Sequence, residues 1–377
     1  MTGVLPYGRQ SVDESDIAAV TAVLRGDWLT AGPAVAAFEE ALAERTGGVP
    51  CVSVTSGTAA LHVAYAVAGV GPGTEVVTTP MTFVATASMA VLLGAEVVFA
   101  DVAPDTANLD PEAAAAAGSP RTRAIAAVDY AGHPADYPAL GGVAGRLGVP
   151  LIADAAHSLG STWNGTPVGA LADLTTYSFF PTKNATTGEG GAVAVKDPAS
   201  LERARLFRRH GLVRDPGLLR SPDEGGWHQE VHTFGFNYRL PDVLCALGSS
   251  QLARLATFKE RRARLVARYN ELLADVPGLT LPAARPGADP MWHLYAVRVL
   301  DGRRREVYER MRAAGIGVQV NYIPAYWHPV FEDLGYRRGM CPAAEAFYAE
   351  QLSLPLFPDL TRGDQDRVVE SLRDILT

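Results

Sequence analysis

Cys51-Val-Ser-Val-Thr-Ser-Gly-Thr-Ala-Ala-Leu61 joins a short apolar run directly to the start of a helical segment, and this alternation repeats along the chain. Further apolar, strand-like runs lie at 75–79, 96–100, 124–128, 151–153, 175–179 and 192–195. Helical segments separate most of these runs, at 58–70, 85–93 and 137–147. Strands that alternate with helices form a mostly parallel sheet covered on both faces. The sequence therefore predicts an α/β fold around a seven-stranded, mostly parallel sheet.

Helical segments are expected on both sides of this region. A capping-box pattern at Ser11-Val-Asp-Glu14 predicts a helix that ends near Gly26, and a second helix is expected at 35–44. The pattern from 241 to about 276 carries apolar residues on one side and arginines on the other. It predicts one long helix that connects two domains.

A smaller α+β unit is expected after a loop at 282–290 that is rich in Pro, Ala and Gly. Its predicted strands lie at 293–299 and 318–322, and its predicted helices at 305–314, 343–351 and 364–376. We place the domain boundary near residue 255. This divides the chain into a large domain over 1–255, which includes an N-terminal arm, and a small C-terminal domain over 256–377.

The composition excludes several classes of function. The net charge of −8 argues against a nucleic-acid binder, which is usually basic. The N-terminus has no signal-peptide pattern, and no apolar run is long enough to span a bilayer, so no membrane partner and a cytoplasmic location are expected. The three cysteines are far apart in the sequence, which predicts buried free thiols. Two histidines four residues apart, His228 and His232, lack the His-Glu-x-x-His order, so no metal site is predicted.

The chain contains three lysines, and the rest of its positive charge is arginine. Lysine is the side chain that forms a Schiff base with an aldehyde cofactor. Lys196 precedes an Asp-Pro turn, and Lys259 lies among charged residues on a helix. Lys183 lies in an irregular polar stretch, 178–191, between two strand-like runs. Because the chemistry of such sheets gathers in the loops after strands, Lys183 is the candidate catalytic amine.

A carboxylate ends another strand, in Leu151-Ile-Ala-Asp154, and His157 follows three residues later. A buried carboxylate needs a cationic partner, and a protonated pyridine nitrogen is such a partner in pyridoxal phosphate (PLP) enzymes. The alternative is that Asp154 only caps the following turn. The residues alone leave both interpretations open.

A phosphate site is a candidate at Ser56-Gly57-Thr58, where a helix begins directly after a strand. Free backbone N–H groups at a helix N-terminus bind phosphate, but many helices begin in this way. The sequence has no Walker motif and no G-x-G-x-x-G after a strand, which disfavours nucleotide hydrolysis and nicotinamide chemistry.

Taken together, motifs spread along the chain resemble the sugar aminotransferase family of PLP enzymes, the group named for DegT and StrS. The matching segments are Trp28-Leu-Thr-Ala-Gly-Pro33, Thr55 to Leu61, Thr79-Pro-Met-Thr-Phe-Val-Ala-Thr86, Asp154-Ala-Ala-His157, Ser178 to Gly191, Gly235-Phe-Asn-Tyr-Arg239 and Leu352-Ser-Leu-Pro355. The resemblance implies the type I fold of aspartate aminotransferase, with a large PLP domain and a smaller C-terminal α+β domain.

The resemblance also implies roles for individual residues. Lys183 is expected to form the Schiff base with PLP, Asp154 to pair with the pyridine nitrogen and His157 to lie near the phenolic oxygen. Phe83 is expected against the ring face. Some relatives carry histidine at the position of Lys183 and act as dehydratases, so lysine here favours transamination.

The expected phosphate contacts are Gly57, Thr58 and Ser178. By the same resemblance, Asn237 reaches the phosphate of a neighbouring subunit, so the active site is expected to need a homodimer.

The predicted reaction transfers an amino group from L-glutamate to a keto sugar by way of pyridoxamine phosphate. Two segments, 5–10 and 319–328, resemble the branch that aminates C4 of UDP- or dTDP-linked 4-keto-6-deoxyhexoses, including the enzyme that makes the precursor of pseudaminic acid. That similarity makes six residues candidate substrate contacts: Tyr7, Trp28, Thr30, Tyr322, Tyr326 and His328. The alternative is that the aromatic residues among them belong to the core of the small domain.

Three other functions stay open on the sequence. One is amination at C3, because the sequence does not separate C3 from C4 or UDP from dTDP. Another is a PLP-dependent sugar dehydratase of the same fold, against which Lys183 argues. The third is a non-catalytic regulator with this fold, against which the intact set of Lys183, Asp154, Ser178 and Asn237 argues.

Overall fold

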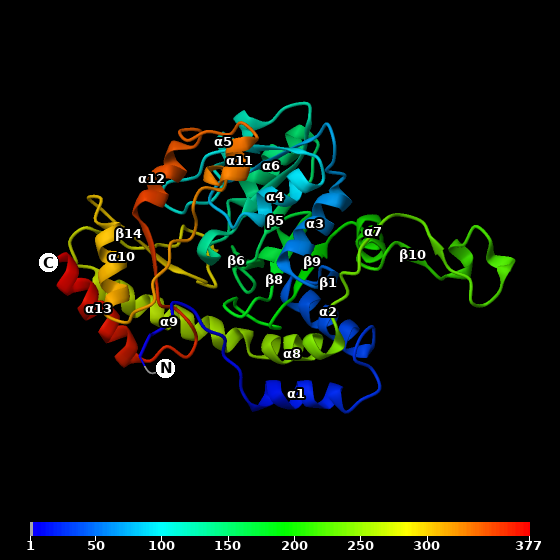
Figure 1. The fold of residues 1–377 in the computed structure, drawn as a ribbon, viewed down its shortest axis with the longest axis horizontal. Coiled ribbons are helices and arrows are strands. Elements are labelled where there is room, and N and C mark those ends of the chain that lie inside the picture. Colours follow the sequence, from blue (N-terminus) through cyan, green and yellow to red (C-terminus); the bar gives the residue numbers. More distant parts are fainter. Residues whose placement is uncertain (1–2) are drawn as a thin grey trace.

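The computed structural model describes residues 3–377 and confirms the α/β architecture (Figure 1). The central sheet has seven strands in the order β1-β9-β8-β5-β4-β2-β3. Their bounds are β1 Cys51–Val54, β2 Glu75–Thr78, β3 Glu96–Phe99, β4 Thr122–Val128, β5 Leu151–Asp154, β8 Leu174–Ser178 and β9 Gly191–Val195. Only β9 runs antiparallel to its neighbours, β1 and β8. The carboxyl ends of the other six strands therefore meet at one edge of the sheet.

Helices cover both faces of the sheet, which explains why its strands are continuously apolar. One face packs against α3 (Gly57–Ala68), α4 (Ala85–Leu92) and α7 (Pro198–Arg208). The other packs against α2 (Pro33–Arg45), α5 (Pro111–Ala117), α6 (Tyr137–Leu147) and α8 (Asp242–Ala253). In β4, Ala124 and Ala126 face the first layer and Ile125 and Ala127 the second, and all four are fully buried.

The N-terminal helix α1 (Glu14–Leu24) packs on the outside of α8 and begins at a different cap from the one predicted. Asp13, rather than Ser11, is the N-cap residue. Its carboxylate accepts the N–H of Ser15 at 2.9 Å, and the carboxylate of Asp16 accepts the N–H of Asp13 at 3.0 Å. The capping box is therefore Asp13 with Asp16. The helix ends close to Gly26, as expected.

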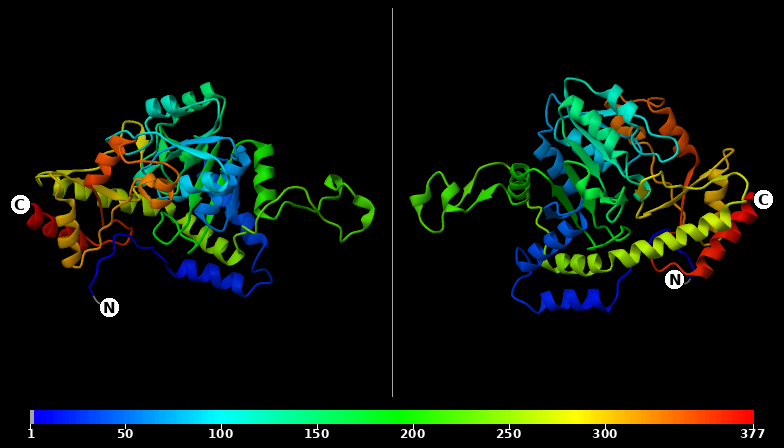
Figure 2. Two further views of the ribbon diagram at one scale, coloured as in Figure 1. Left: turned by 45° about the horizontal axis from the view of Figure 1, so that its top comes forward. Right: turned by 180° about the vertical axis from the view of Figure 1, so that it is seen from behind.

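The long connecting helix predicted over 241–276 is two helices, α8 and α9 (Leu255–Leu273). Arg254 separates them with a ψ of 1°, and its guanidinium pairs with Asp13 at 2.7 Å and with Asp16. Figure 2 shows α9 leading from α8 to the C-terminal unit. Phe258 packs into the core of the large sheet and Val266 into the core of the C-terminal unit, so α9 belongs to both.

The C-terminal unit is built on a three-stranded antiparallel sheet in the order β12-β14-β15. Its elements are β12 Leu279–Thr280, β14 Tyr295–Val299, α10 Arg304–Ala313, α11 Pro329–Asp333, α12 Pro342–Glu350, β15 Gln351–Leu354 and α13 Arg362–Leu376. Strand β15 was not predicted. The strand predicted at 318–322 is wrong, because this segment makes only one bridge, between Gln319 and Ser353.

The N-terminal segment packs on the C-terminal unit. Leu5 donates its N–H to Gly315 O at 2.9 Å and is buried in the C-terminal core. The boundary near residue 255 stays a prediction, since residues outside 256–377 contribute to that core.

A long arm, residues 209–239, projects from the molecule beyond α7 (Figures 1 and 2). It contains a short hairpin of β10 (Leu212–Val213) and β11 (Glu230–Val231), and a bridge between Arg209 and Asn237 closes its base. Apolar side chains are strongly exposed along it, with Phe234 at 93% and Trp227 at 84%. A further small sheet combines β6 (Thr162–Trp163), β7 (Thr166–Pro167) and β13 (Ala288–Asp289).

Candidate functional site

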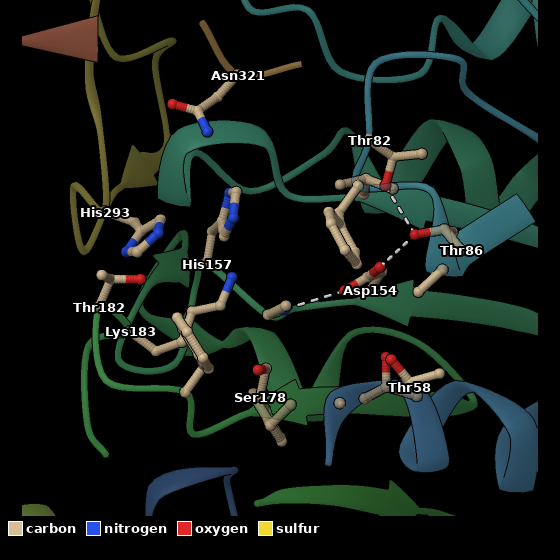
Figure 3. A pocket seen from close by; sticks show the side chains of 18 of the residues that line it. Thr58, Thr82, Thr86, Asp154, His157, Ser178, Thr182, Lys183, His293 and Asn321 are labelled. Atoms are coloured by element: carbon tan, nitrogen blue, oxygen red, sulfur yellow. Dashed lines mark hydrogen bonds between the residues drawn. The ribbon is translucent and has the colours of Figure 1, made fainter. Parts of the chain in front are cut away.

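A cavity of about 390 Å³ lies at the carboxyl edge of the sheet, within the size range of small-molecule sites. Loops that follow β1, β2, β5 and β8 form most of its wall. The C-terminal unit contributes His293, Asn321 and Tyr322. Residues that are far apart in the sequence thus face one space (Figure 3).

Lys183 lies in the turn after β8, and its amine points toward His157 in Figure 3. Burial lowers the pKa of the amine from 10.5 to about 8, although the negative charge of Asp154 partly opposes the shift. A substantial fraction of the amine is therefore neutral near pH 7 to 8, as a nucleophile or base requires. The other lysines lie elsewhere. Lys259 pairs with Asp289 at 2.6 Å, and Lys196 is exposed after β9.

Asp154 ends β5 and is only 7% exposed. Its Oδ2 accepts the hydroxyl of Thr86 at 2.6 Å, and its Oδ1 accepts the N–H of Ala156 at 3.2 Å. Burial raises the pKa of the carboxyl, while these two hydrogen bonds and the charge of Lys183 oppose that rise. The hydrogen bond from Ala156 is the contact expected if Asp154 only caps the following turn. The second carboxylate oxygen instead accepts a hydrogen bond from Thr86 in α4, which is distant in the sequence.

His157 is buried beside Lys183, and its Nε2 lies 3.0 Å from the hydroxyl of Tyr322. Burial and the nearby Lys183 hold the pKa of His157 well below its usual range, so the ring is neutral. His293 stacks against it with ring centroids 4.2 Å apart. A neutral imidazole next to an oxygen donates or accepts one hydrogen bond without adding charge to the cavity.

The start of α3 forms a cradle for an anion. The Ser56 hydroxyl caps the helix by accepting the N–H of Ala59 at 3.1 Å, which leaves the N–H groups of Gly57 and Thr58 outside the helix ladder. A Cβ on Gly57 would lie 2.7 Å from the Cβ of Ser178, so a side chain does not fit there. The free N–H groups, the Thr58 and Ser178 hydroxyls and the helix dipole suit a phosphate group.

The structure brings together most of the predicted cofactor contacts but not all of the predicted substrate contacts. Phe83 lies at the cavity, 59% exposed, with its ring 6.1 Å from that of Tyr322. Tyr7 also lines the cavity. Three predicted residues are exposed and do not line it: Trp28, Thr30 and Asn237.

The structure contradicts the prediction that Tyr326 contacts the substrate. This side chain is fully buried, packs against Phe99, and its hydroxyl donates to Glu345 at 2.5 Å and accepts the N–H of Cys341 at 3.2 Å. It belongs to the core that packs on the α3 and α4 face of the large sheet, whereas the alternative interpretation placed it in the core of the small domain. His328 is half-buried at the start of α11 and does not line the cavity.

Sequence reasoning missed several polar groups at the cavity. Thr82 and Thr86 stand in the quoted segment 79–86, but no role was assigned to them. His293 and Asn321 lie at or within segments that were predicted as strands, which gave no signal for a site. His228 and His232 are on the arm, where both contact Glu230. Within residues 3–377 no group of three or more acidic, His or Cys residues is arranged to hold a metal ion.

Comparison with known proteins identifies the family and the fold. The model of the DegT/DnrJ/EryC1/StrS aminotransferase family matches residues 10–373. The chain belongs to this family. It is 36% identical to the spore coat polysaccharide biosynthesis protein SpsC of Bacillus subtilis, over 99% of this chain and 97% of that protein.

Two solved structures extend this relationship to three dimensions. The PMP form of Spr1654 from Streptococcus pneumoniae matches with a TM-score of 0.93 and 29% identity, over 98% of both chains. PseC from Helicobacter pylori, an aminotransferase involved in the biosynthesis of pseudoaminic acid, matches with a TM-score of 0.92 and 30% identity, over 99% of both chains. This protein is a PLP-dependent sugar aminotransferase, which acts on a keto sugar and an amino donor.

The chain's own residues fit this cofactor. A side chain at Gly57 would clash with Ser178 beside the free N–H groups that start α3. A buried carboxylate lines the same cavity, together with a lysine whose pKa is lowered. The described helices include none with the length and apolar character that crossing a bilayer requires.

Proposed function

We propose that this enzyme transfers the amino group of L-glutamate to C4 of a nucleotide-linked 4-keto-6-deoxyhexose, with UDP or dTDP as the carrier. The observation that supports the chemistry is the convergence of Lys183, Asp154 and the start of α3 on one cavity. The similarity of segments 5–10 and 319–328 to the C4-aminating branch supports the substrate, as does the likeness to PseC. The products are 2-oxoglutarate and a 4-amino sugar.

When bound, PLP supplies an aldehyde and a ring that withdraws electrons from the bond being broken. Lys183 would hold that aldehyde covalently until the amine of the donor displaces it, and the released lysine amine would then carry the proton to and from the donor's α-carbon. Its pKa of about 8 lets the amine both accept and return a proton near neutral pH. Asp154, as an anion, holds a proton on the ring nitrogen.

The remaining residues hold the cofactor in place. The N–H groups of Gly57 and Thr58 and the hydroxyl of Ser178 bind the phosphate. Phe83 covers one ring face at the open side of the cavity, and neutral His157 donates a hydrogen bond toward the phenolic oxygen.

We also propose that the working unit is a homodimer. Asn237, Trp28 and Thr30 are exposed away from the cavity of their own chain, and Asn237 lies at the base of an arm with exposed aromatic residues. A second copy that packs against this arm would bury these side chains and receive Asn237 at its phosphate site. Trp28 and Thr30 would then reach the substrate of the partner.

The test offers the purified enzyme UDP- and dTDP-linked 4-keto-6-deoxyhexoses side by side with L-glutamate. Formation of 2-oxoglutarate should depend on the keto sugar, and NMR of the product should place the new amine on C4. An amine on C3, or turnover only with 3-keto sugars, would contradict the proposal and assign the C3 reaction instead.

A further inference from the structure

A chain of buried hydroxyl groups at the wall of the cavity ends on Asp154. Thr86, at the start of α4, is fully buried and donates its hydroxyl proton to Asp154 Oδ2 at 2.6 Å. The hydroxyl of Thr82, 2% exposed, lies 2.7 Å from that of Thr86. Since Thr86 uses its one proton on the carboxylate, Thr82 is the donor in the second bond. Figure 3 shows the two bonds in sequence.

A further hydrogen bond holds the backbone at Thr86. The hydroxyl of the fully buried Tyr65 donates to the carbonyl of Thr86 at 2.7 Å. Val84, the N-cap residue of α4, makes no side-chain cap. The bond between Thr82 and Thr86 therefore spans the start of this helix and ties down the loop that presents Phe83. The same hydroxyls thus connect the residue at the ring face with the carboxylate at the ring nitrogen.

The chemistry of Asp154 requires such support. Burial favours the neutral acid, which cannot pair with a protonated ring nitrogen. A hydroxyl that donates to a carboxylate stabilises the anion and fixes the direction of its lone pairs. Without Thr86, the carboxylate keeps only the longer bond from Ala156 and the field of Lys183.

We propose that Thr86 is a positioning residue for transamination, which holds Asp154 ionised and aimed at the cofactor nitrogen, and that Thr82 acts through Thr86. This inference rests on the role proposed above for Asp154. It predicts that the two hydroxyls matter for cofactor binding and for the protonation of the ring.

The first test compares Thr86→Val, which keeps the shape and removes the hydroxyl, with Thr86→Ser, which keeps the hydroxyl. Thr175→Val is the matched control, because Thr175 is a fully buried threonine of β8 whose hydroxyl has no partner. Thr86→Val should weaken PLP binding to the apoprotein and lower kcat by about 10- to 100-fold, the range expected for a bond to a charged group. Thr86→Ser and Thr175→Val should stay within about threefold of the wild type.

A spectroscopic titration separates this role from simple packing. In the PLP-loaded Thr86→Val protein, the pH midpoint of the cofactor absorbance change, which reports the proton on the Lys183 nitrogen, should move to higher pH. The reason is that a ring nitrogen that holds its proton less tightly places less positive charge beside that group. Thr86→Ser should restore the midpoint. Wild-type affinity and an unchanged midpoint in Thr86→Val, or an equal defect in Thr86→Ser, would overturn the proposal.

Two further variants complete the design. Thr82→Val should have a smaller effect than Thr86→Val, and the double variant should lose no more than Thr86→Val alone, because Thr82 acts through Thr86. If the losses of activity in the two single variants add up in the double variant, Thr82 does not act through Thr86. Asp154→Asn tests the underlying role by itself. If Asp154→Asn behaves as the wild type, the proposed role of Asp154 is wrong. If Asp154→Asn is defective and the threonine variants are not, only the proposed role of Thr86 and Thr82 is wrong.

Discussion

At the scale of single residues, the environment of Lys183 predicts how the protein takes up its cofactor. Only the neutral amine attacks the aldehyde, and burial lowers the pKa of Lys183 from 10.5 to about 8. At pH 7 about one amine in ten is then neutral, against fewer than about one in a thousand for an ordinary lysine. The rate of PLP binding to the apoprotein, followed by absorbance, should rise with pH and level off above about pH 8. A rate that still climbs tenfold per pH unit at pH 9.5 would contradict this assignment.

Gly57 provides a second residue-scale prediction. A Cβ at this position would lie 2.7 Å from the Cβ of Ser178, so Gly57→Ala must displace one wall of the phosphate cradle. The dissociation constant for PLP should rise at least about tenfold, because removing one good phosphate contact costs about that factor. Gly71→Ala is the control, since its Cβ would meet only Leu93 O at 3.8 Å. Equal PLP affinities in the two variants would show that Gly57 does not shape the cradle.

The sequence located the residues that follow strands but not the residues that support them. Gly57, Asp154 and Ser178 stand at the ends of apolar runs, where a parallel sheet places its chemistry. Thr86 reaches Asp154 across 68 positions, and this contact depends on how α4 packs on the sheet. The pattern of neighbouring residues in the sequence does not indicate a contact between positions so far apart. For the same reason it did not show that Tyr326 turns into the core.

At the scale of elements, the predicted strands of the large sheet agree with the structure to within about two residues, because each is a buried apolar run between turns. The segment 318–322 has a similar pattern and is not a strand. Side chains form hydrogen bonds with the backbone of this segment in place of a neighbouring strand. The Gln351 side chain accepts the N–H of Asn321 at 2.8 Å, and the Tyr130 hydroxyl donates to the carbonyl of Asn321. Strand propensity does not indicate that side chains will bind the backbone groups that a neighbouring strand would otherwise pair with.

Helix α6 offers a prediction about stability. Gly145 lies inside this helix, and a Cβ there would meet nothing within 4 Å. Gly145→Ala should therefore raise the free energy of unfolding by about 0.5–1 kcal/mol, since alanine loses less backbone entropy in a helix. Urea denaturation measures the change. Gly169→Ala is the contrasting variant and should destabilise, because its Cβ would lie 2.4 Å from that of Thr46. A less stable Gly145→Ala protein would contradict the open space at α6.

At the scale of the whole molecule, the projecting arm predicts that two chains share each active site. In mixtures of Lys183→Ala and Asn237→Ala proteins, a mixed dimer combines Lys183 of one chain with Asn237 of the other in one intact site. Activity should therefore recover on mixing, after the dimers are allowed to exchange, up to about a quarter of the wild-type level by random pairing. The control repeats the mixture with Lys183→Ala alone. No recovery, with mixed dimers demonstrated by mass spectrometry, would place Asn237 in its own chain's site.

The sequence pattern alone did not point to the arm as a contact surface, because its exposed aromatic residues resemble core residues in the sequence. Phe234 becomes informative only when the structure shows that its side chain is 93% exposed in the arm. The resemblance to a family supplied the expectation of a dimer, and the exposed arm supports the proposal of where the second chain packs.

The central claim is that Lys183 binds pyridoxal phosphate covalently, and borohydride reduction tests it most directly. The protein is loaded with PLP, reduced, digested and analysed by peptide mass spectrometry. The account predicts one phosphopyridoxyl group, on the peptide that contains Lys183, and no modification of the Lys183→Ala protein under the same conditions. Modification at Lys196 or Lys259 with Lys183 unmodified, or no stable adduct at all, would contradict it.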